Sequence, residues 1–200
     1  MDCVELSIEK LENVSKALAA KIQKEYNSKF DLVIYIAKGG YLIGKTISEE
    51  LNLPLLSIYA ERSGNQGKEF LSPILAKLPR WMTINLRKIE LKSGFHKGAK
   101  ERHVYFKEDI SKYQNCSLSI LIVDDSVDTG YSVLSVQRAI YENFSNVKDI
   151  KIAALNVWNK SLEVIKTDFS LYQNTILITP MSKDSRDYNI FCKICKDRNI

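Results

Sequence analysis

Residues 120–132 read I-L-I-V-D-D-S-V-D-T-G-Y-S and carry the strongest signal in the chain. The apolar run Ile120 to Val123 is typical of a strand that is buried on both faces of a parallel sheet. Open α/β sheets bind ligands at the carboxyl ends of their strands, so Asp124 and Asp125 are expected at a binding site. Acids that only cap a loop are the simpler alternative for either residue taken alone.

The turn after these acids has the composition of an anion-binding loop. Thr129 and Ser132 supply hydroxyl groups, and Gly130 lets the backbone approach a ligand closely. A helix that begins near Ser132 would direct several backbone N–H groups, and the positive end of its dipole, at one point. The stretch therefore predicts a carboxylate pair for a sugar diol beside a phosphate site, a combination that fits a ribose phosphate.

The string V-D-D-S-V-D-T-G-Y-S resembles the phosphoribosyl-pyrophosphate signature of type I phosphoribosyltransferases. That signature has an apolar strand, two acids, a short variable pair, a residue before Thr-Gly and a hydroxyl shortly after. Asp128 resembles the form found in the 6-oxopurine enzymes (hypoxanthine-guanine and xanthine-guanine types), where this acid lies beside N7 of the purine as the candidate base. A helix N-cap is the alternative role for Asp128.

The resemblance implies transfer of ribose 5-phosphate from phosphoribosyl pyrophosphate (PRPP) to an acceptor, with release of pyrophosphate and with Mg²⁺ as cofactor. Asp124 and Asp125 would bind the ribose hydroxyls and contact the metal indirectly, through PRPP. Asp128 would be the catalytic base. The 5-phosphate is expected in the turn that comprises Asp128, Thr129, Gly130, Tyr131 and Ser132. Small or basic residues are more usual at position 131, so Tyr131 is expected to contribute its backbone.

The segments before the signature predict a βαβ unit and hence a parallel sheet. Residues 31–37 are an apolar strand, residues 41–51 carry a helical apolar face and residues 54–59 are a second strand. We expect an α/β fold with a Rossmann-like core of the phosphoribosyltransferase type and helices on both faces of the sheet. By resemblance, the turn at the end of the first strand grips pyrophosphate with the Lys38 side chain and with the amides of Gly39 and Gly40.

A competing motif overlaps this turn. Residues 39–46 read G-G-Y-L-I-G-K-T and match the P-loop pattern, which would make the protein a nucleotide kinase. A phosphate-wrapping loop needs small residues so that its amides converge on the anion, whereas residues 41–43 are bulky and apolar. We therefore expect Lys45 on a helix surface and keep the P-loop kinase as an alternative.

Periodicity predicts the remaining elements. Residues 7–26 and 132–144 carry apolar side chains at helical spacing. Further strands are expected at 151–158, 168–171 and 174–178, followed by a polar loop and a short tail. Residues 1–200 are treated as a single phosphoribosyltransferase domain with a small C-terminal hood at about 168–200.

Residues 60–117 differ from this pattern and are expected to form an inserted lid. The segment is basic and contains scattered aromatic residues, with Arg102 and His103 near its end. Alternation at 83–91 and 103–107 predicts two β-segments, with a hairpin around 92–100. A structureless loop of this length is unusual in a compact domain. A solvated basic face is the alternative.

Composition bounds the class of protein. A chain of 200 residues that is 45% hydrophobic and 26% charged suits one domain, and its net charge of +5 is too small to indicate nucleic acid by itself. No signal peptide and no membrane segment are visible, so we expect a cytoplasmic protein. Cys192-x-x-Cys195 is half of a zinc pattern without a partner pair, so no metal site is expected there. We also expect a homo-oligomer, a dimer.

The acceptor is less clearly indicated than the donor. In the 6-oxopurine enzymes a lysine near the position of Lys160 reads the exocyclic oxygen of the purine, although a surface lysine is equally compatible. An aromatic residue usually stacks on the base, but Met181 stands where it is expected, so Trp158 or Tyr188 would take that role. A purine acceptor in nucleotide salvage is the first hypothesis. A sugar acceptor in glycan biosynthesis and an RNA-binding regulator on the same fold are the alternatives.

Overall fold

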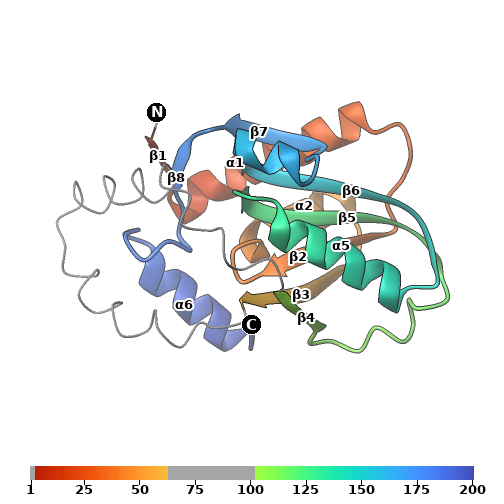
Figure 1. Cartoon of the computed structure of the whole chain (residues 1–200). Helices are drawn as coiled ribbons and strands as arrows, with labels where there is room; N and C mark the ends of the chain where they lie inside the picture. The colour runs from red at the N-terminus through yellow and green to blue at the C-terminus, as the bar shows by residue number, and fades with distance from the viewer. Residues whose placement is uncertain (1–2, 63–101) are drawn as a thin grey trace.

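The computed structural model describes residues 3–62 and 102–200, and Figure 1 shows a central sheet with helices packed on it. The strand order in this six-stranded sheet is β4-β3-β2-β5-β6-β7. Neighbouring strands are parallel except for the β3–β4 pair. The strands are β2 (Leu32–Ala37), β3 (Leu55–Arg62), β4 (Arg102–Phe106), β5 (Ser117–Val127), β6 (Asn146–Val157) and β7 (Phe169–Gln173). The predicted α/β fold with a mostly parallel sheet is confirmed.

Helices cover both faces of this sheet (Figure 1). The two N-terminal helices pack on one face and α5 packs on the other. Side chains alternate across a strand. Val33 and Tyr35 of β2 therefore pack in the core between the sheet and the two N-terminal helices, whereas Ile34 packs in the core between the sheet and α5. All three are buried, which is why this strand is apolar throughout. The helices are α1 (Ile8–Glu25), α2 (Tyr41–Leu51) and α5 (Tyr131–Asn143).

The direction of chain progression reverses between β2 and β5. From β2 the chain passes through α2 to β3, whereas from β5 it passes through α5 to β6 on the other side. The loops that leave β2 and β5 therefore diverge at the carboxyl edge of the sheet. In open α/β sheets this switch point is where ligands bind.

The edge of the sheet differs from the prediction. β4 pairs antiparallel with β3, in register from Ile58–Phe106 to Arg62–Arg102, so residues 102–106 belong to the main sheet and not to an inserted lid. The predicted β-segment at 103–107 is thereby confirmed. The predicted segment at 83–91 and the hairpin around 92–100 lie outside the described residues.

The C-terminal part also differs from the prediction. β7 lies in the central sheet, so the hood begins later than residue 168. β8 (Ile176–Ile178) pairs in parallel with β1 (Cys3–Glu5) in a separate two-stranded sheet. Residues 188–197 form helix α6 (Tyr188–Asp197) and not an irregular tail. Across the described residues, no helix combines the length and apolar character that a bilayer crossing requires.

Candidate active site

The acid pair lies at the carboxyl end of β5. This strand runs beyond the predicted end at Val123 to Val127, so both acids are part of it. The Asp125 amide donates to Asp124 Oδ1 (2.9 Å), and the Ser126 amide donates to Asp125 Oδ1 (2.9 Å). Each carboxylate is therefore oriented by the amide that follows it.

Burial makes ionisation of this pair costly. Asp124 is 8% exposed, and burial raises its pKa well above the usual range, with a further contribution from the Asp125 charge. Burial likewise raises the pKa of Asp125, and the charge of Asp128 adds to that effect. A ligand that donates hydrogen bonds or brings positive charge would offset the cost of ionising both groups. A sugar diol with an associated cation supplies both.

The start of α5 presents uncapped amide groups. Its N-cap residue is Gly130, which makes no side-chain cap, whereas the α1 N-terminus is capped by Ser7, whose side chain accepts from the Lys10 amide (3.3 Å). First-turn amides of a helix have no intrahelical acceptor, so the α5 terminus suits an anion. Asp128 precedes this cap by two residues, so it is not the N-cap residue.

Gly130 is required by both conformation and space. Its φ is +82°, in the left-handed region that L side chains rarely adopt. A Cβ at this position would lie 2.8 Å from Ile165 Cγ2 and 3.2 Å from Val164 Cβ. Glycine therefore lets the turn after β5 pack tightly against the segment that follows β6.

A small cavity of about 60 Å³ opens at this turn. Its volume is far below the roughly 300 Å³ at which sites for drug-sized ligands begin, so it suits a small group such as a phosphate. Arg102, from β4, contributes a positive charge to its wall. The lining residues on β5 and α5 are Asp124, Ser126, Val127, Asp128, Thr129, Gly130, Ser132 and Val133. Tyr131 is absent from the lining.

The loop after β2 abuts the acid pair. A Cβ on Gly39 would lie 2.9 Å from Asp125 Oδ1, and one on Gly40 would lie 2.6 Å from the Val123 carbonyl oxygen. Both glycines therefore permit close approach of the predicted pyrophosphate loop to β5. The Gly40 amide donates to the Ile36 carbonyl (2.9 Å), which corrects the expectation that this amide serves pyrophosphate. Lys38 is exposed at the head of the loop.

The P-loop alternative is wrong. Residues 41–46 are the first turns of α2, and the Gly44 amide donates to the Gly40 carbonyl (2.7 Å) within that helix. Lys45 Nζ pairs with Glu49 Oε1 (2.7 Å) on the helix surface, as expected. A Cβ on Gly44 would lie 2.7 Å from Tyr35 Cβ, so this glycine serves helix–strand packing. Amides committed to a helix cannot converge on a phosphate.

Helix α6 lies beside the start of α2, because Ile194 lines a pocket together with Tyr41 and Leu42. Burial raises the pKa of the Cys195 thiol in α6, and the positive charge of Lys38 acts in the opposite direction. Lys107 Nζ donates to the Asn199 carbonyl, which ties the end of the chain to β4. The helix therefore stands where a C-terminal hood is expected (Figure 1).

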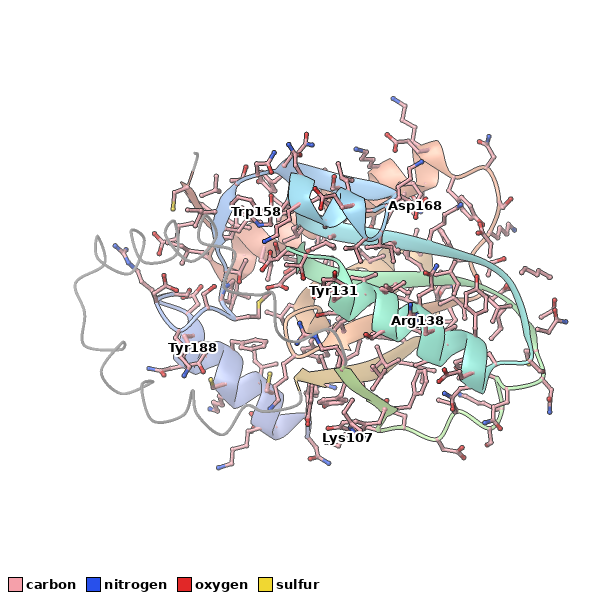
Figure 2. All side chains as sticks on the ribbon, viewed as in Figure 1. Lys107, Tyr131, Arg138, Trp158, Asp168 and Tyr188 are labelled. Carbon is pink, nitrogen blue, oxygen red and sulfur yellow. The ribbon has the colours of Figure 1, made fainter. Side chains whose placement is uncertain are left out.

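The predicted acceptor residues lie on several separate elements. Trp158 follows β6, and its amide donates to the Val127 carbonyl (3.0 Å), which joins it to the end of β5. Lys160 is exposed on the short helix η2 (Asn159–Glu163). Tyr188 begins α6, and its pKa is raised by a hydrogen bond with Cys192. Figure 2 shows Trp158 and Tyr188 on different elements at the carboxyl end of the sheet.

Two polar residues at this edge were not predicted as site residues. Ser126 separates the acid pair from the third acid, and its hydroxyl donates to Asp128 Oδ1 (2.7 Å). Asn156 is 1% exposed in β6 and its Nδ2 donates to Ser126 Oγ (3.3 Å). A polar side chain inside the apolar run A-A-L-N-V was the available signal, because a buried polar group is informative. For Arg102 the sequence predicts only a place in a basic segment.

Comparisons with known proteins agree with this geometry. The phosphoribosyl transferase domain model matches residues 6–179. An adenine phosphoribosyltransferase of Borreliella burgdorferi (strain ZS7) is 31% identical over 138 residues, which are 68% of this chain and 64% of that protein. The chain thus matches slightly less than two thirds of that relative's length.

Solved structures share the fold at lower sequence identity. A purine phosphoribosyltransferase from Pyrococcus horikoshii Ot3 superposes with a TM-score of 0.60 at 20% identity, covering 91% of this chain and 95% of that one. A xanthine-guanine-hypoxanthine phosphoribosyltransferase from Helicobacter pylori gives a TM-score of 0.57 at 15% identity, with 96% of each chain covered. With the family model matching most of its length, the chain belongs to the type I phosphoribosyltransferase family.

Proposed function

We propose that the protein transfers ribose 5-phosphate from PRPP to a purine base, preferably a 6-oxopurine, and releases pyrophosphate. One observation carries the proposal: the acid pair, the uncapped α5 terminus and the loop after β2 meet at the switch point of the sheet. We call this set, residues 38–40 and 124–132, the donor half of the site. The acceptor half comprises Trp158, Lys160, Met181 and Tyr188.

The donor half has a place for each part of PRPP. The ribose diol would donate hydrogen bonds to Asp124 and Asp125, which would favour their ionised forms against the cost of burial. The 5-phosphate would occupy the 60 Å³ cavity, with the first-turn amides of α5 and the Arg102 side chain as donors. The pyrophosphate would lie near Lys38, beyond the acid pair that Gly39 touches.

Mg²⁺ fits this arrangement as a partner of the donor. When bound, it would neutralise charge on the leaving pyrophosphate, and Asp124 and Asp125 would contact it indirectly through PRPP. The raised pKa values of the two acids agree with a pair that awaits positive charge. The chain's own part is to hold the diol and the two phosphate ends apart, so that C1 of the ribose faces the acceptor.

The proposed role of Asp128 is to accept the proton of the incoming nucleophile or to hydrogen-bond to it. Charge at C1 becomes oxocarbenium-like as pyrophosphate leaves, and the purine nitrogen that bonds to C1 becomes more acidic. A carboxylate beside the base can then accept the base's proton or hydrogen-bond to it. Asp128 is exposed at the mouth of the donor half, where an acceptor would arrive.

The purine acceptor is supported by the form of the third acid and by the adenine phosphoribosyltransferase relative. The test is pyrophosphate release from PRPP and Mg²⁺, screened with guanine, hypoxanthine, xanthine, adenine, uracil and simple sugars. We expect turnover with purines and the highest kcat/KM with a 6-oxopurine. Highest activity with adenine would correct the base and keep the reaction.

Other results would replace the proposal. PRPP binding with turnover only on sugars would assign a glycan pathway. PRPP-independent RNA binding that weakens steeply with salt, without turnover, would assign a regulator. Failure to bind PRPP in the presence of Mg²⁺ would refute the donor half itself.

A further inference from the structure

A chain of hydrogen bonds runs from the protein interior to Asp128. The Thr175 backbone amide lies 3.2 Å from Asn156 Oδ1. Asn156 Nδ2 lies 3.3 Å from Ser126 Oγ, and Ser126 Oγ lies 2.7 Å from Asp128 Oδ1. Ser126 and Asn156 are register partners on the adjacent strands β5 and β6, so the middle of the chain is held by the sheet.

The direction of these hydrogen bonds is fixed at the buried end. A backbone N–H can only donate, so the Asn156 atom that faces Thr175 must be the carbonyl oxygen. The NH₂ group of Asn156 therefore points at Ser126 and donates to its hydroxyl oxygen. The Ser126 hydroxyl is then directed to donate to the Asp128 carboxylate, which only accepts when it is ionised.

The three side chains differ in exposure, from the buried Asn156 to the exposed Asp128. Asn156 is 1% exposed, Ser126 is half-buried and Asp128 is exposed on the bend after β5. An exposed aspartate loses rotamer entropy when it is held in one orientation, and a hydrogen bond to a residue on a rigid strand offsets part of that loss. Hydrogen bonding to residues of the sheet thereby restricts the orientation of a carboxylate that lies outside the sheet.

We propose that Ser126 and Asn156 are positioning residues that orient the Asp128 carboxylate toward the acceptor. The inference rests on the proposed function, since it assumes that Asp128 handles the acceptor's proton. Both residues act through Asp128. Ser126 also lines the cavity proposed for the 5-phosphate, so a small loss of PRPP affinity is expected with it. The loss of either residue is expected to lower kcat much more than PRPP affinity, because these residues maintain the near-attack geometry.

The first experiment replaces Ser126. Ser126→Ala is expected to lower kcat about tenfold, the effect of losing one hydrogen bond to a charged group. Ser126→Thr keeps the hydroxyl and is expected to restore kcat to within about threefold of wild type. Turnover is measured as pyrophosphate release with guanine, hypoxanthine and adenine, and PRPP affinity by calorimetry with Mg²⁺. Ser119→Ala is the matched control, because it removes a buried hydroxyl near the amino-terminal end of the same strand.

The second experiment reverses the direction of the hydrogen bond between residue 156 and Ser126. Asn156→Asp, once ionised, replaces the NH₂ donor with an acceptor, so the Ser126 hydroxyl would turn toward residue 156 and away from Asp128. Burial raises the pKa of a carboxyl group at this position, so turnover of this variant is compared with wild type at alkaline pH. We expect a loss of kcat at least as large as in Ser126→Ala, with little further loss when the two changes are combined. If Asn156→Asp does not fold, the comparison of Ser126→Ala with Ser126→Thr alone tests the positioning role.

Asp128→Asn separates the outcomes. If Asp128→Asn loses turnover while Ser126→Ala keeps wild-type kcat, the positioning role is refuted and the proposed function stands. Equal impairment of Ser126→Ala and Ser126→Thr, or a loss confined to PRPP affinity, also refutes it. Wild-type turnover in Asp128→Asn removes the assumed base and this inference with it. If Ser126→Ala costs no turnover in the Asp128→Asn background, the two residues act as one unit.

Discussion

The donor half and the acceptor half of the site differ in how the chain builds them. The donor half comes from one continuous stretch at the end of β5 and one short loop that touches it. The acceptor residues come from the end of β6, from η2, from the turn before α6 and from α6 itself. A contiguous site inherits its geometry from one strand and one helix, whereas a dispersed site depends on how several segments pack.

This difference has an energetic side. The donor half holds two carboxylates that burial makes costly to ionise, so it stores an unfavourable term that a ligand can relieve. In the acceptor half Lys160 is exposed and Trp158 is half-buried. Changes in the donor half should therefore produce larger effects on turnover and on PRPP affinity than changes in the acceptor half.

The largest effect is expected at Asp128. Asp128→Asn keeps the shape of the side chain and removes the proton acceptor, so kcat should fall by about 100-fold or more while PRPP affinity stays within about twofold. Steady-state pyrophosphate release and calorimetry measure the two quantities. Asp109→Asn, an exposed aspartate in the loop after β4, is the control and should have wild-type kcat. Unchanged turnover in Asp128→Asn would reduce this acid to a loop residue.

The next effect is expected at Asp125. Asp125→Asn removes an acceptor for the ribose diol, so PRPP affinity should fall about tenfold, the value of a hydrogen bond to a charged group. Calorimetry with PRPP and Mg²⁺ measures this loss. Pyrophosphate alone lacks the diol and should bind the variant and the wild type equally. A variant that binds PRPP like the wild type would place the ribose elsewhere.

Replacement of Asp124 is expected to increase the stability of the protein, whereas the preceding variants lose activity or affinity. Its pKa is raised in the folded state, so the folded protein retains a proton that the unfolded chain has lost. Stability is therefore lost as pH rises from the unfolded value, near 4, through the raised folded value. Asp124→Asn should raise the free energy of unfolding at pH 7 by roughly 1 kcal/mol or more, and this gain should vanish at acidic pH.

Denaturant unfolding across pH measures this difference. The control is again Asp109→Asn, because the pKa of Asp109 is lowered by the hydrogen bond from the Ser111 amide. That variant should show no stabilisation at any pH. An Asp124→Asn protein that is less stable than the wild type at pH 7 would mean that the carboxylate is needed for folding and not only for the ligand.

The smallest effect is expected at Lys160. Lys160→Ala should raise the KM for a 6-oxopurine about threefold and leave PRPP affinity unchanged, because an exposed lysine contributes about 1 kcal/mol at most to a contact. Lys166→Ala removes a neighbouring exposed lysine and is the control. An unchanged KM would leave the acceptor half without its predicted purine reader and would sharpen the contrast between the halves.

The same contrast explains what the sequence could predict. The acids, the turn after β5 and the βαβ unit are local patterns, and each appears in the structure close to its expected bounds. Antiparallel pairing of β4 and the position of Arg102 in the wall of the small cavity depend on contacts between residues forty positions apart, Arg62 and Arg102. The signal for helix α6 was available in the sequence, because Tyr188, Phe191 and Cys195 recur at helical spacing, and the last two are buried.

Two details of the donor half also escaped prediction. The Gly40 amide donates to the Ile36 carbonyl oxygen, whereas the sequence predicts that it donates to a ligand. Residue spacing does not reveal this backbone hydrogen bond. The Asn156–Ser126–Asp128 chain joins residues on two strands and depends on their register, which a one-residue slip would destroy. The register between neighbouring strands cannot be predicted from a single sequence.

The register of β3 and β4 has a consequence for engineering. Arg62 and Arg102 are paired, so β3 ends and β4 begins at neighbouring points, whatever sequence fills the interval between them. A two-residue hairpin can join paired antiparallel strands, so this interval can be exchanged as a cassette while the strands that anchor it keep their pairing. Transplanting the corresponding interval between family members would therefore leave the β3–β4 pairing unaltered, and with it the place of Arg102 in the cavity wall.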